Sequence, residues 1–184
     1  MVWNNQKDQS SKKRGAVFLY IWANGQLQKK KKTRSYILIC LLLCIVFTYS
    51  LHRYHFHQVT GTSMEDTLVN GNIVIVDKFS SLTRYSIIAI QRSSTDEIVK
   101  RIIGIPGDSI EVVENELTLH LGNEPHSPTE IFRLSPEAVA QMNHLTYLPE
   151  NTYFVLGDNP DISEDSRTFG LVSHSRILGK VIFK

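Results

Sequence analysis

Two residues far apart in the chain, a serine and a lysine, have side chains that could do chemistry together. Ser63 precedes Met64 in the stretch Gly61–Leu68, and Lys100 lies in the apolar stretch Ile98–Ile103. A serine hydroxyl is a poor nucleophile until a base takes its proton. Lysine can be that base only when neutral, and burial favours the neutral amine because desolvation penalises the charged form. The pair predicts a nucleophile, Ser63, with Lys100 as its base.

The local pattern around Lys100 does not decide this alone. In a β-strand, Lys100 would share one face with Ile98 and Ile102, but lysines also occur in edge strands as solvated guards against aggregation. A histidine-based triad is the other way to activate a serine. The chain has seven histidines, yet none has a recognisable triad context and no Gly-x-Ser-x-Gly motif is present.

A third polar stretch lies near the C-terminus. Gly157-Asp158-Asn159 is followed by Ser163, Asp165 and Arg167. By themselves these residues indicate a turn and a structural ion pair. We expect a structural loop whose side chains also support Lys100.

The elements that must position these groups begin with a membrane anchor. Residues 1–34 carry nine basic groups and one acid, or 9 − 1 = +8, so a net charge of +2 leaves 2 − 8 = −6 for the rest. A basic head before an acidic body argues against nucleic-acid binding and is typical of a cytoplasmic membrane flank. We expect a cytoplasmic basic tail over residues 1–34, a transmembrane helix over 35–52 and an extracytoplasmic body over 53–184. A cleavable signal peptide is the alternative for the apolar run.

The body is expected to be mainly β, an antiparallel coiled or partly closed sheet, with one short surface helix. The helix starts at Ser135-Pro136-Glu137, a capping serine followed by proline and an acid. Residues 123–150, which include it, are interpreted as a surface excursion. Short β-branched runs between turn signals predict strands over 72–77, 85–91, 97–103, 109–113, 116–121, 152–156 and 177–183.

Neither a cofactor nor a metal is expected. Cys40 and Cys44 both lie in the apolar run, so the body has no thiolate for a disulfide or a metal site. His52, His55 and His57 follow the span without neighbouring carboxylates. We expect these imidazoles to lie at the lipid headgroups rather than to ligate a metal.

Three ordered boxes carry a resemblance to a known family. They resemble those of type I signal peptidases, membrane-anchored Ser/Lys endopeptidases that remove signal peptides from exported proteins. The single span and short body look like the Gram-positive branch. The boxes are Ser63-Met64-x-x-Thr67-Leu68, Lys100-Arg101-x-x-Gly104-x-Pro106-Gly107-Asp108, and Gly157-Asp158-Asn159-x-x-x-Ser163-x-Asp165-Ser166-Arg167-x-x-Gly170.

The resemblance implies a role for each matching residue. Ser63 would form an acyl-enzyme and supply one oxyanion donor through its backbone N–H. Lys100 would take the Ser63 proton and then activate the deacylating water. Ser163 would hydrogen-bond and orient the Lys100 amine. The remaining supporting residues would be Met64, packing beside the nucleophile, the ion pair of Asp165 with Arg167, and Asp158.

The resemblance also implies the partners, which are signal peptides of secreted preproteins and a lipid bilayer. The substrate would bind as an added β-strand, with shallow apolar pockets for small side chains. The sequence departs from the family pattern at Asp66, where proline is usual, at Pro160, where arginine is common, and at Gly61, where some members carry a serine as oxyanion donor. Thr60 or Thr62 are the nearby hydroxyls that could replace that donor.

The departure from the family pattern at Asp66 motivates an alternative hypothesis from another class of function. A non-catalytic relative could act as an accessory protein or chaperone in surface-protein or pilus assembly. The presence of both Ser63 and Lys100 argues against it, because a protein that only binds peptides needs neither. A self-cleaving regulator with a similar core is a third alternative, which the anchor and the lack of a DNA-binding domain disfavour.

Overall fold

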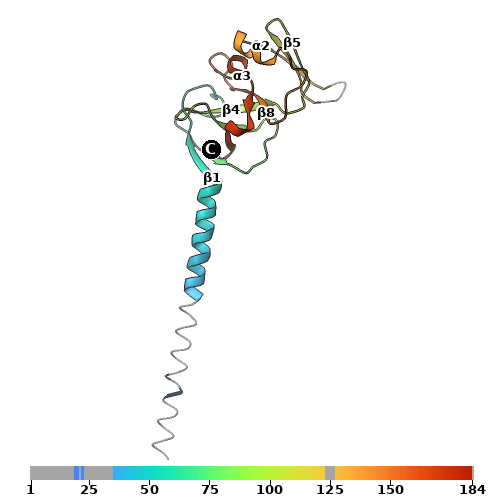
Figure 1. The fold of residues 1–184 in the computed structure, drawn as a ribbon. Coiled ribbons are helices and arrows are strands. Elements are labelled where there is room, and N and C mark those ends of the chain that lie inside the picture. Colours follow the sequence, from blue (N-terminus) through green and yellow to red (C-terminus); the bar gives the residue numbers. More distant parts are fainter. Residues whose placement is uncertain (1–18, 21, 23–34, 123–126, 184) are drawn as a thin grey trace, which may run out of the picture. The chain divides into compact units, whose positions relative to one another are not determined.

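The computed structural model describes residues 19–20, 22, 35–122 and 127–183. The chain divides into two units, residues 1–51 and 52–184. Apart from Leu19, Tyr20 and Trp22, the predicted basic tail lies outside the described residues. Figure 1 shows the elements in chain order.

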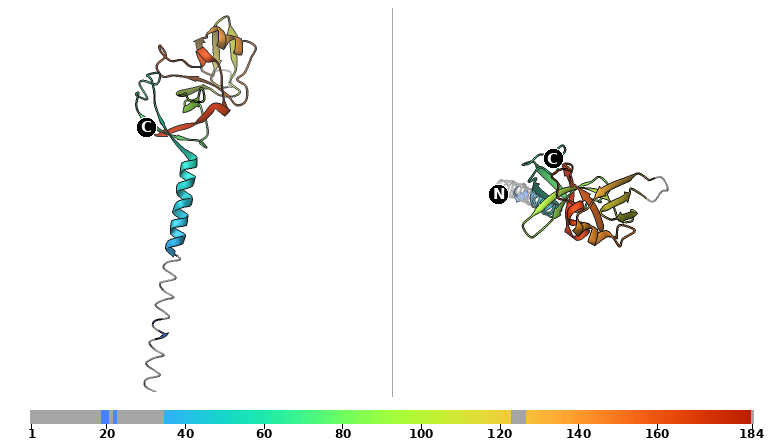
Figure 2. Two further views of the ribbon diagram at one scale, coloured as in Figure 1. Left: turned by 60° about the vertical axis from the view of Figure 1, so that its left-hand side comes forward. Right: turned by 90° about the horizontal axis from the view of Figure 1, so that it is seen from above.

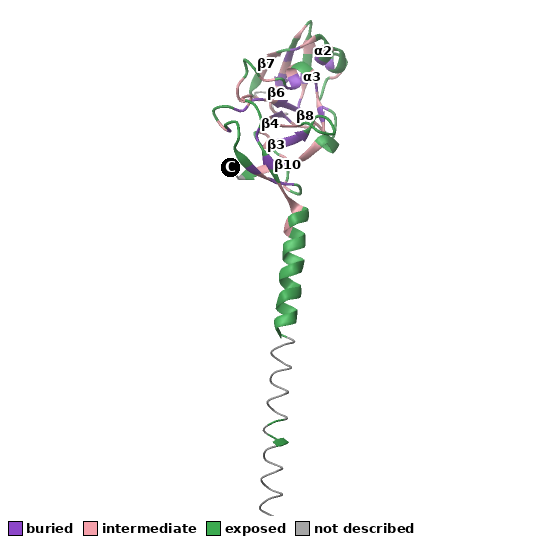
Figure 3. Ribbon diagram, turned by 90° about the vertical axis from the view of Figure 1, so that its left-hand side faces the viewer, coloured by how far each residue is buried: buried purple, intermediate pink, exposed green. Residues whose placement is uncertain are grey.

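The first unit contains one described helix that is long and apolar enough to cross a membrane, Ser35–Arg53, whose last residues extend into the second unit. It is exposed along nearly its whole length (Figure 3). Within this helix, the Thr48 and Ser50 hydroxyls donate to main-chain carbonyls one turn earlier. Such internal bonding suits a segment surrounded by lipid, which offers no water to polar groups.

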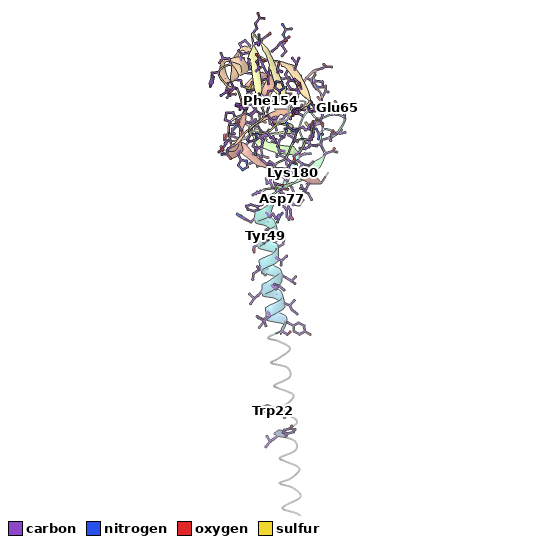
Figure 4. All side chains as sticks on the ribbon, turned by 90° about the vertical axis from the view of Figure 1, so that its right-hand side faces the viewer. Trp22, Tyr49, Glu65, Asp77, Phe154 and Lys180 are labelled. Atoms are coloured by element: carbon purple, nitrogen blue, oxygen red, sulfur yellow. The ribbon has the colours of Figure 1, made fainter. Side chains whose placement is uncertain are left out.

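The second unit is built on a seven-stranded sheet of order β1-β2-β10-β3-β4-β8-β9, and every neighbouring pair is antiparallel. The order brings Asp77 of β2 beside Lys180 of β10 (Figure 4). This arrangement confirms the predicted mainly β antiparallel body. The strands are β1 Tyr54–Gln58, β2 Ile73–Asp77, β3 Ile87–Gln91, β4 Glu97–Gly104, β8 Thr152–Leu156, β9 Val172–Ser173 and β10 Ile177–Phe183.

A smaller sheet of three antiparallel strands contains β5 Ile110–Val113, β6 Glu116–His120 and β7 Thr129–Arg133. The helix α2, Pro136–Met142, follows β7, and Ser135 caps it as predicted by accepting from the Ala138 amide. Figure 2 shows this sheet and α2 from two further sides.

The described part of residues 123–150, interpreted from the sequence as a surface excursion, is mostly exposed but also contributes buried side chains to a core. Only the outer face of α2 is exposed, while Ala138 and Met142 are fully buried. Together with Leu134 and Leu148 they close a core over Leu117, Leu119 and Phe154. The segment from β7 onward is therefore part of the fold, because its apolar side chains recur on one face of the strand and of the helix.

The seven-stranded sheet carries an apolar cluster on each face. Strand alternation directs Ala89 and Val99 into one cluster, where Met64 and Leu68 cover them. The other cluster contains Ile88, Ile90, Ile102, Tyr153, Val155 and Val172. The chain before β2, which contains Ser63, is thus attached to the sheet by buried apolar side chains.

A buried ion pair fixes the turn after β4. Both Asp108 oxygens accept from the Arg84 guanidinium at 2.7 Å, and Asp108 also accepts from the Ile105 amide at 2.8 Å. Gly104 is required because a Cβ there would lie 2.6 Å from Leu148 Cδ1. The Gly-x-Pro-Gly-Asp part of the second box therefore has a structural role.

One edge of β4 is open beside Lys100. β3 pairs with β4 from Glu97 to Arg101, whereas β8 on the other side pairs only from Arg101 to Gly104. Unpaired strand edges bind extended peptides through main-chain hydrogen bonds.

Candidate active site

The structure brings the predicted nucleophile and base together. Lys100 Nζ lies 2.6 Å from Ser63 Oγ, a hydrogen bond that spans 37 residues of sequence. Lys100 stands opposite Ile88 in the β3–β4 ladder, and Ile88 and Ile102 share one apolar cluster. Lys100 therefore shares its face with isoleucines, as strand alternation predicts.

The environment of Lys100 favours the neutral amine. Its side chain is 2% exposed, and burial lowers its pKa below that of free lysine. The negative charge of Asp165 opposes this shift, while the positive charges of Arg92 and Arg167 add to it. A lysine with a lowered pKa and a serine hydroxyl in hydrogen-bond contact can act as base and nucleophile.

A tight turn presents the nucleophile. Residues 62–68 are closed by bonds from the Glu65 amide to the Thr62 carbonyl and from the Leu68 amide to the Met64 carbonyl. Met64 and Leu68 are each 1% exposed, so they anchor the turn while Ser63 is half-buried. Met64 thus packs beside the nucleophile, as the resemblance implies.

The Gly-Asp-Asn stretch holds the nucleophile through its main chain. The Asn159 amide donates to the Ser63 carbonyl at 3.0 Å. A Cβ at Gly157 would lie 2.5 Å from the same carbonyl oxygen and would also clash with Ser163. Glycine is therefore needed at 157 because of this close approach, although its φ is ordinary.

Asp165 is the buried anchor of this loop. It is 0% exposed and caps the short helix α3, Ser166–Phe169. Arg167 donates to both of its oxygens at 2.9 and 2.8 Å, and the Gly157 amide donates to one at 3.0 Å. Burial would raise the pKa of Asp165, but the hydrogen bonds from Arg167 and Gly157, with the Ser163 hydroxyl nearby, hold it below its usual value. The expected ion pair is thus formed and tied to Gly157.

A second ion pair joins β4 to the same loop. Arg101, the residue after Lys100, donates to both oxygens of Asp158 at 2.8 and 2.6 Å. Arg101 also donates to Thr67 Oγ1 at 3.3 Å and to the Tyr85 carbonyl at 2.9 Å. Burial opposes the ionised form of Asp158, yet the bonds from Arg101 and Thr67 leave its pKa lowered. Asp158 therefore links the strand of the base to the turn of the nucleophile.

Ser163 does not make its expected contact. Its hydroxyl is buried and has no hydrogen-bond partner of good geometry among the described residues, so the implied bond to Lys100 is not formed. The side chain lies against Gly157 instead. It is near enough to the Asp165 carboxylate to help lower its pKa, although the geometry falls short of a regular hydrogen bond.

Two positions that depart from the family pattern have positive φ. Gly61 has φ of +85° and Asp66 has φ of +90°. Proline is locked near −65° and could not occupy position 66 in this conformation. The serine of other members would be strained at Gly61, because residues with a Cβ rarely adopt such values.

The histidines after the span do not all face the headgroups, as we expected they would. His55 and His57 belong to β1, and His57 is 8% exposed with Nδ1 2.8 Å from Glu97 Oε2. The sequence hid this contact because Glu97 is 40 residues away. Across the described residues, no group of three or more histidine, cysteine or acidic side chains is arranged to hold a metal ion.

Comparisons with known proteins show the family of the chain. A model of the family described as "Signal peptidase, peptidase S26" matches residues 32–184. The chain belongs to the signal peptidase family. A signal peptidase I of Bacillus caldolyticus is 34% identical over 170 residues, covering 85% of this chain and 92% of its own. A signal peptidase IB of Staphylococcus aureus is 30% identical over 176 residues, which cover 85% of this chain and 90% of the relative. A crystal structure of a signal peptidase I from Enterococcus faecalis V583 has a TM-score of 0.39 at 30% identity and covers 56% of this chain and 98% of its own.

Membership in the signal peptidase family fixes the class of reaction. The chain is a serine endopeptidase, a hydrolase whose family cleaves signal peptides from preproteins. The alternatives of an accessory protein and of a self-cleaving regulator are thereby set aside. Its relatives include signal peptidases of Gram-positive bacteria, as the short body behind one apolar helix predicted.

Proposed function

We propose that this signal peptidase uses Ser63 as nucleophile and Lys100 as general base, and that it acts through an acyl-enzyme. The observation that carries the proposal is the hydrogen bond of 2.6 Å between Lys100 Nζ and Ser63 Oγ inside a site that excludes water from the lysine. A neutral amine accepts a proton, whereas a charged one cannot. Burial lowers the pKa of Lys100 and so favours the neutral amine, which can act as a base.

Ser63 Oγ attacks the scissile carbonyl carbon while its proton passes to Lys100 Nζ. The tetrahedral intermediate collapses when the carbon–nitrogen bond breaks, and Lys100 returns the proton to the leaving amine. The released amine is the new N-terminus of the mature protein. Lys100 then takes a proton from water, whose oxygen attacks the ester carbon. The ester carbon–oxygen bond breaks as Ser63 Oγ regains the proton from Lys100, and the signal peptide leaves as a carboxylic acid that loses its remaining proton to solvent.

The supporting residues act by position. Gly157 and Asn159 hold the Ser63 main chain, and Asp165 holds Gly157. The Ser63 amide then remains available as one oxyanion donor, a type of contact often worth about 10²–10³ in rate. In this proposal Ser163 orients the base only if its hydroxyl turns from Gly157 toward the amine when substrate binds.

The substrate binds in extended form along the open edge of β4, between Glu97 and Lys100. A peptide added there makes main-chain hydrogen bonds next to the base. We further propose that the helix Ser35–Arg53 spans the lipid bilayer, that residues 1–34 are cytoplasmic, and that the body is outside. The partners are then preproteins and the bilayer, and nucleic acid is not bound.

The test of the site is cleavage of a purified preprotein in detergent by the full chain and by Ser63→Ala and Lys100→Ala. Each variant should release no mature protein while its circular dichroism spectrum stays that of the wild type. Release by Lys100→Ala at a comparable rate would exclude this base. Orientation is tested separately, since protease added to intact cells should digest the body and spare the tail.

A further inference from the structure

A pocket of about 250 Å³ lies between the end of β1 and the hairpin that leads into β4. One water occupies about 30 Å³ of liquid, so this space holds a long side chain. None of its lining side chains is aliphatic or a phenyl ring. They are His57, Gln58, Thr60, Ser94, Thr95, Asp96 and Glu97.

The pocket belongs to the same two chain segments that carry the nucleophile and the base. Residues 57–63 and 97–100 are joined at one end by His57 and Glu97 over 2.8 Å, and at the other by Ser63 and Lys100 over 2.6 Å. The pocket lies at the first of these contacts. Glu97 lies three residues before Lys100 on the strand, a distance of about 10 Å.

The charge of the pocket is negative and incompletely paired. Glu97 contacts His57 at 2.8 Å and His55 at 3.6 Å, in both cases through Oε2, and Oε1 has no hydrogen-bond partner among the described residues. The Asp96 carboxylate takes part in none of the hydrogen bonds or ion pairs found among the described side chains, and the positive charge of Arg92 interacts with it only at longer range. His57 Nε2, in the pocket wall, is buried and also lacks a partner there. An apolar side chain in the pocket would cover these polar groups without replacing their hydrogen bonds, which is costly.

We propose that this pocket is a specificity subsite of the active site, and that it takes a lysine or arginine side chain of the substrate about three residues from the bond that is cut. A basic side chain would reach Glu97 Oε1 and Asp96, and the hydroxyls of Ser94 and Thr95 would accept its remaining donors. This differs from the apolar pockets for small side chains that the family resemblance implied. The subsite rests on the proposed function, because it presumes a substrate strand along β4.

The experiment compares peptides that share one cleavable sequence and carry a single lysine or norleucine at each position within about five residues of the cut. The full chain in detergent should cleave one lysine peptide, with lysine about three residues from the cut, about fivefold faster in kcat/KM than its norleucine match, the range expected for a partly exposed ion pair. The ratio of kcat/KM between the lysine and the norleucine peptide should fall toward one in Glu97→Gln, whose amide oxygen still accepts from His57. It should also shrink at high salt.

Two controls separate the failures. Asp96→Asn removes one negative charge from the pocket and leaves the His57–Glu97 hydrogen bond in place. It should reduce the ratio of kcat/KM for the lysine peptide to that for the norleucine peptide, and it serves as the test if Glu97→Gln folds poorly. Glu111→Gln makes the same charge change on the exposed face of β5 and should leave the ratio unchanged. Cleavage of the norleucine peptides with no lysine preference at any position, or a preference that survives both pocket variants, overturns the subsite. Failure of the wild type to cleave any peptide, or the preprotein, would instead count against the proposed function on which the subsite rests.

Discussion

The main-chain amide of Asn159 donates to the carbonyl of Ser63 over 3.0 Å. The nucleophile is therefore held by a loop almost a hundred residues later in the chain, through atoms that every amino acid possesses. The acidic side chains of that loop contact arginines rather than Ser63 itself, since Asp158 pairs with Arg101 and Asp165 with Arg167. Positioning of Ser63 thus depends on the shape of the loop more than on a direct side-chain contact.

Gly157→Ala should reduce cleavage strongly. The added Cβ would lie 2.5 Å from the Ser63 carbonyl oxygen, so the turn or the loop must move. Overpacking of this kind costs about 1–3 kcal/mol, and we expect kcat to fall more than tenfold. Gly71→Ala is the control, because its Cβ meets open space and only its φ of +88° is strained. Equal losses of activity and thermal stability in both variants would show that the close approach at Gly157 is unimportant.

Asp66 should respond oppositely to two substitutions. Asp66→Gly relieves a residue with φ of +90° and should raise the free energy of unfolding by up to about 1 kcal/mol. Asp66→Pro should lower both stability and kcat, because proline cannot adopt this φ and the turn carrying Ser63 must rearrange. Urea unfolding and preprotein cleavage measure the two effects. A proline variant as stable and active as the wild type would mean that the turn has another conformation.

Two charges near Lys100 should shift the pH dependence in opposite directions. Activity rises with pH as Lys100 loses its proton, because the neutral amine is the base. Arg92 lowers the pKa of Lys100 and Glu164 raises it, and the two are paired at 2.7 Å on the surface. Arg92→Gln should move the rising limb of kcat/KM to higher pH and Glu164→Gln to lower pH. Since both side chains are exposed, each shift should be roughly a few tenths of a pH unit and should shrink with salt.

In that experiment the double variant should return close to the wild-type profile. Shifts of the same sign in the two single variants, or a limb that also persists in Lys100→Ala, would show that another group sets the pH dependence.

Lys100→Met should stabilise the protein while it abolishes cleavage. Burial lowers the pKa of Lys100 in the folded state, so the unfolded state binds more protons between that lowered pKa and about 10.4. The wild type therefore gains stability as pH rises through this window, and below the window it carries the full cost of a buried ammonium. The gain in melting temperature of Lys100→Met should be largest below the window and should diminish as pH increases. A gain in melting temperature that does not change with pH would mean that the Lys100 amine is exposed to solvent in the folded protein.

Much of the fold was predictable because β-branched runs lie between clear turn residues. Strands β2 to β6, β8 and β10, and the cap of α2 at Ser135, were found in this way. The sequence did not predict β1, because YHFHQ has the polar residues of a membrane flank, nor β7, which pairs with β6 across residues outside the described part. The burial of Leu134, Ala138, Met142 and Leu148 was not predicted, because their apolar spacing was attributed to a surface segment.

The sequence predicted the identity of the main site residues but not the contacts that hold them. Ser63 and Lys100 could be named because they lie in ordered boxes that resemble those of a known family, and because a serine and a buried lysine can act as nucleophile and base. The geometry of their contact could not be predicted, since it depends on antiparallel pairing and on the turn of residues 62–68. Main-chain contacts such as Asn159 with Ser63 leave no residue-type signal. Ser163 was assigned through resemblance alone, and it lies against Gly157 rather than the amine.

The most direct test of the dyad is the rate at which Ser63 is acylated. The full chain in detergent is mixed with a β-lactam-type acylating probe and followed by intact-mass spectrometry with peptide mapping. We predict one adduct, located on Ser63, which is absent in Ser63→Ala and forms more than about a hundredfold more slowly in Lys100→Met. Acylation of Lys100→Met at the wild-type rate, or an adduct on another residue, would contradict the account.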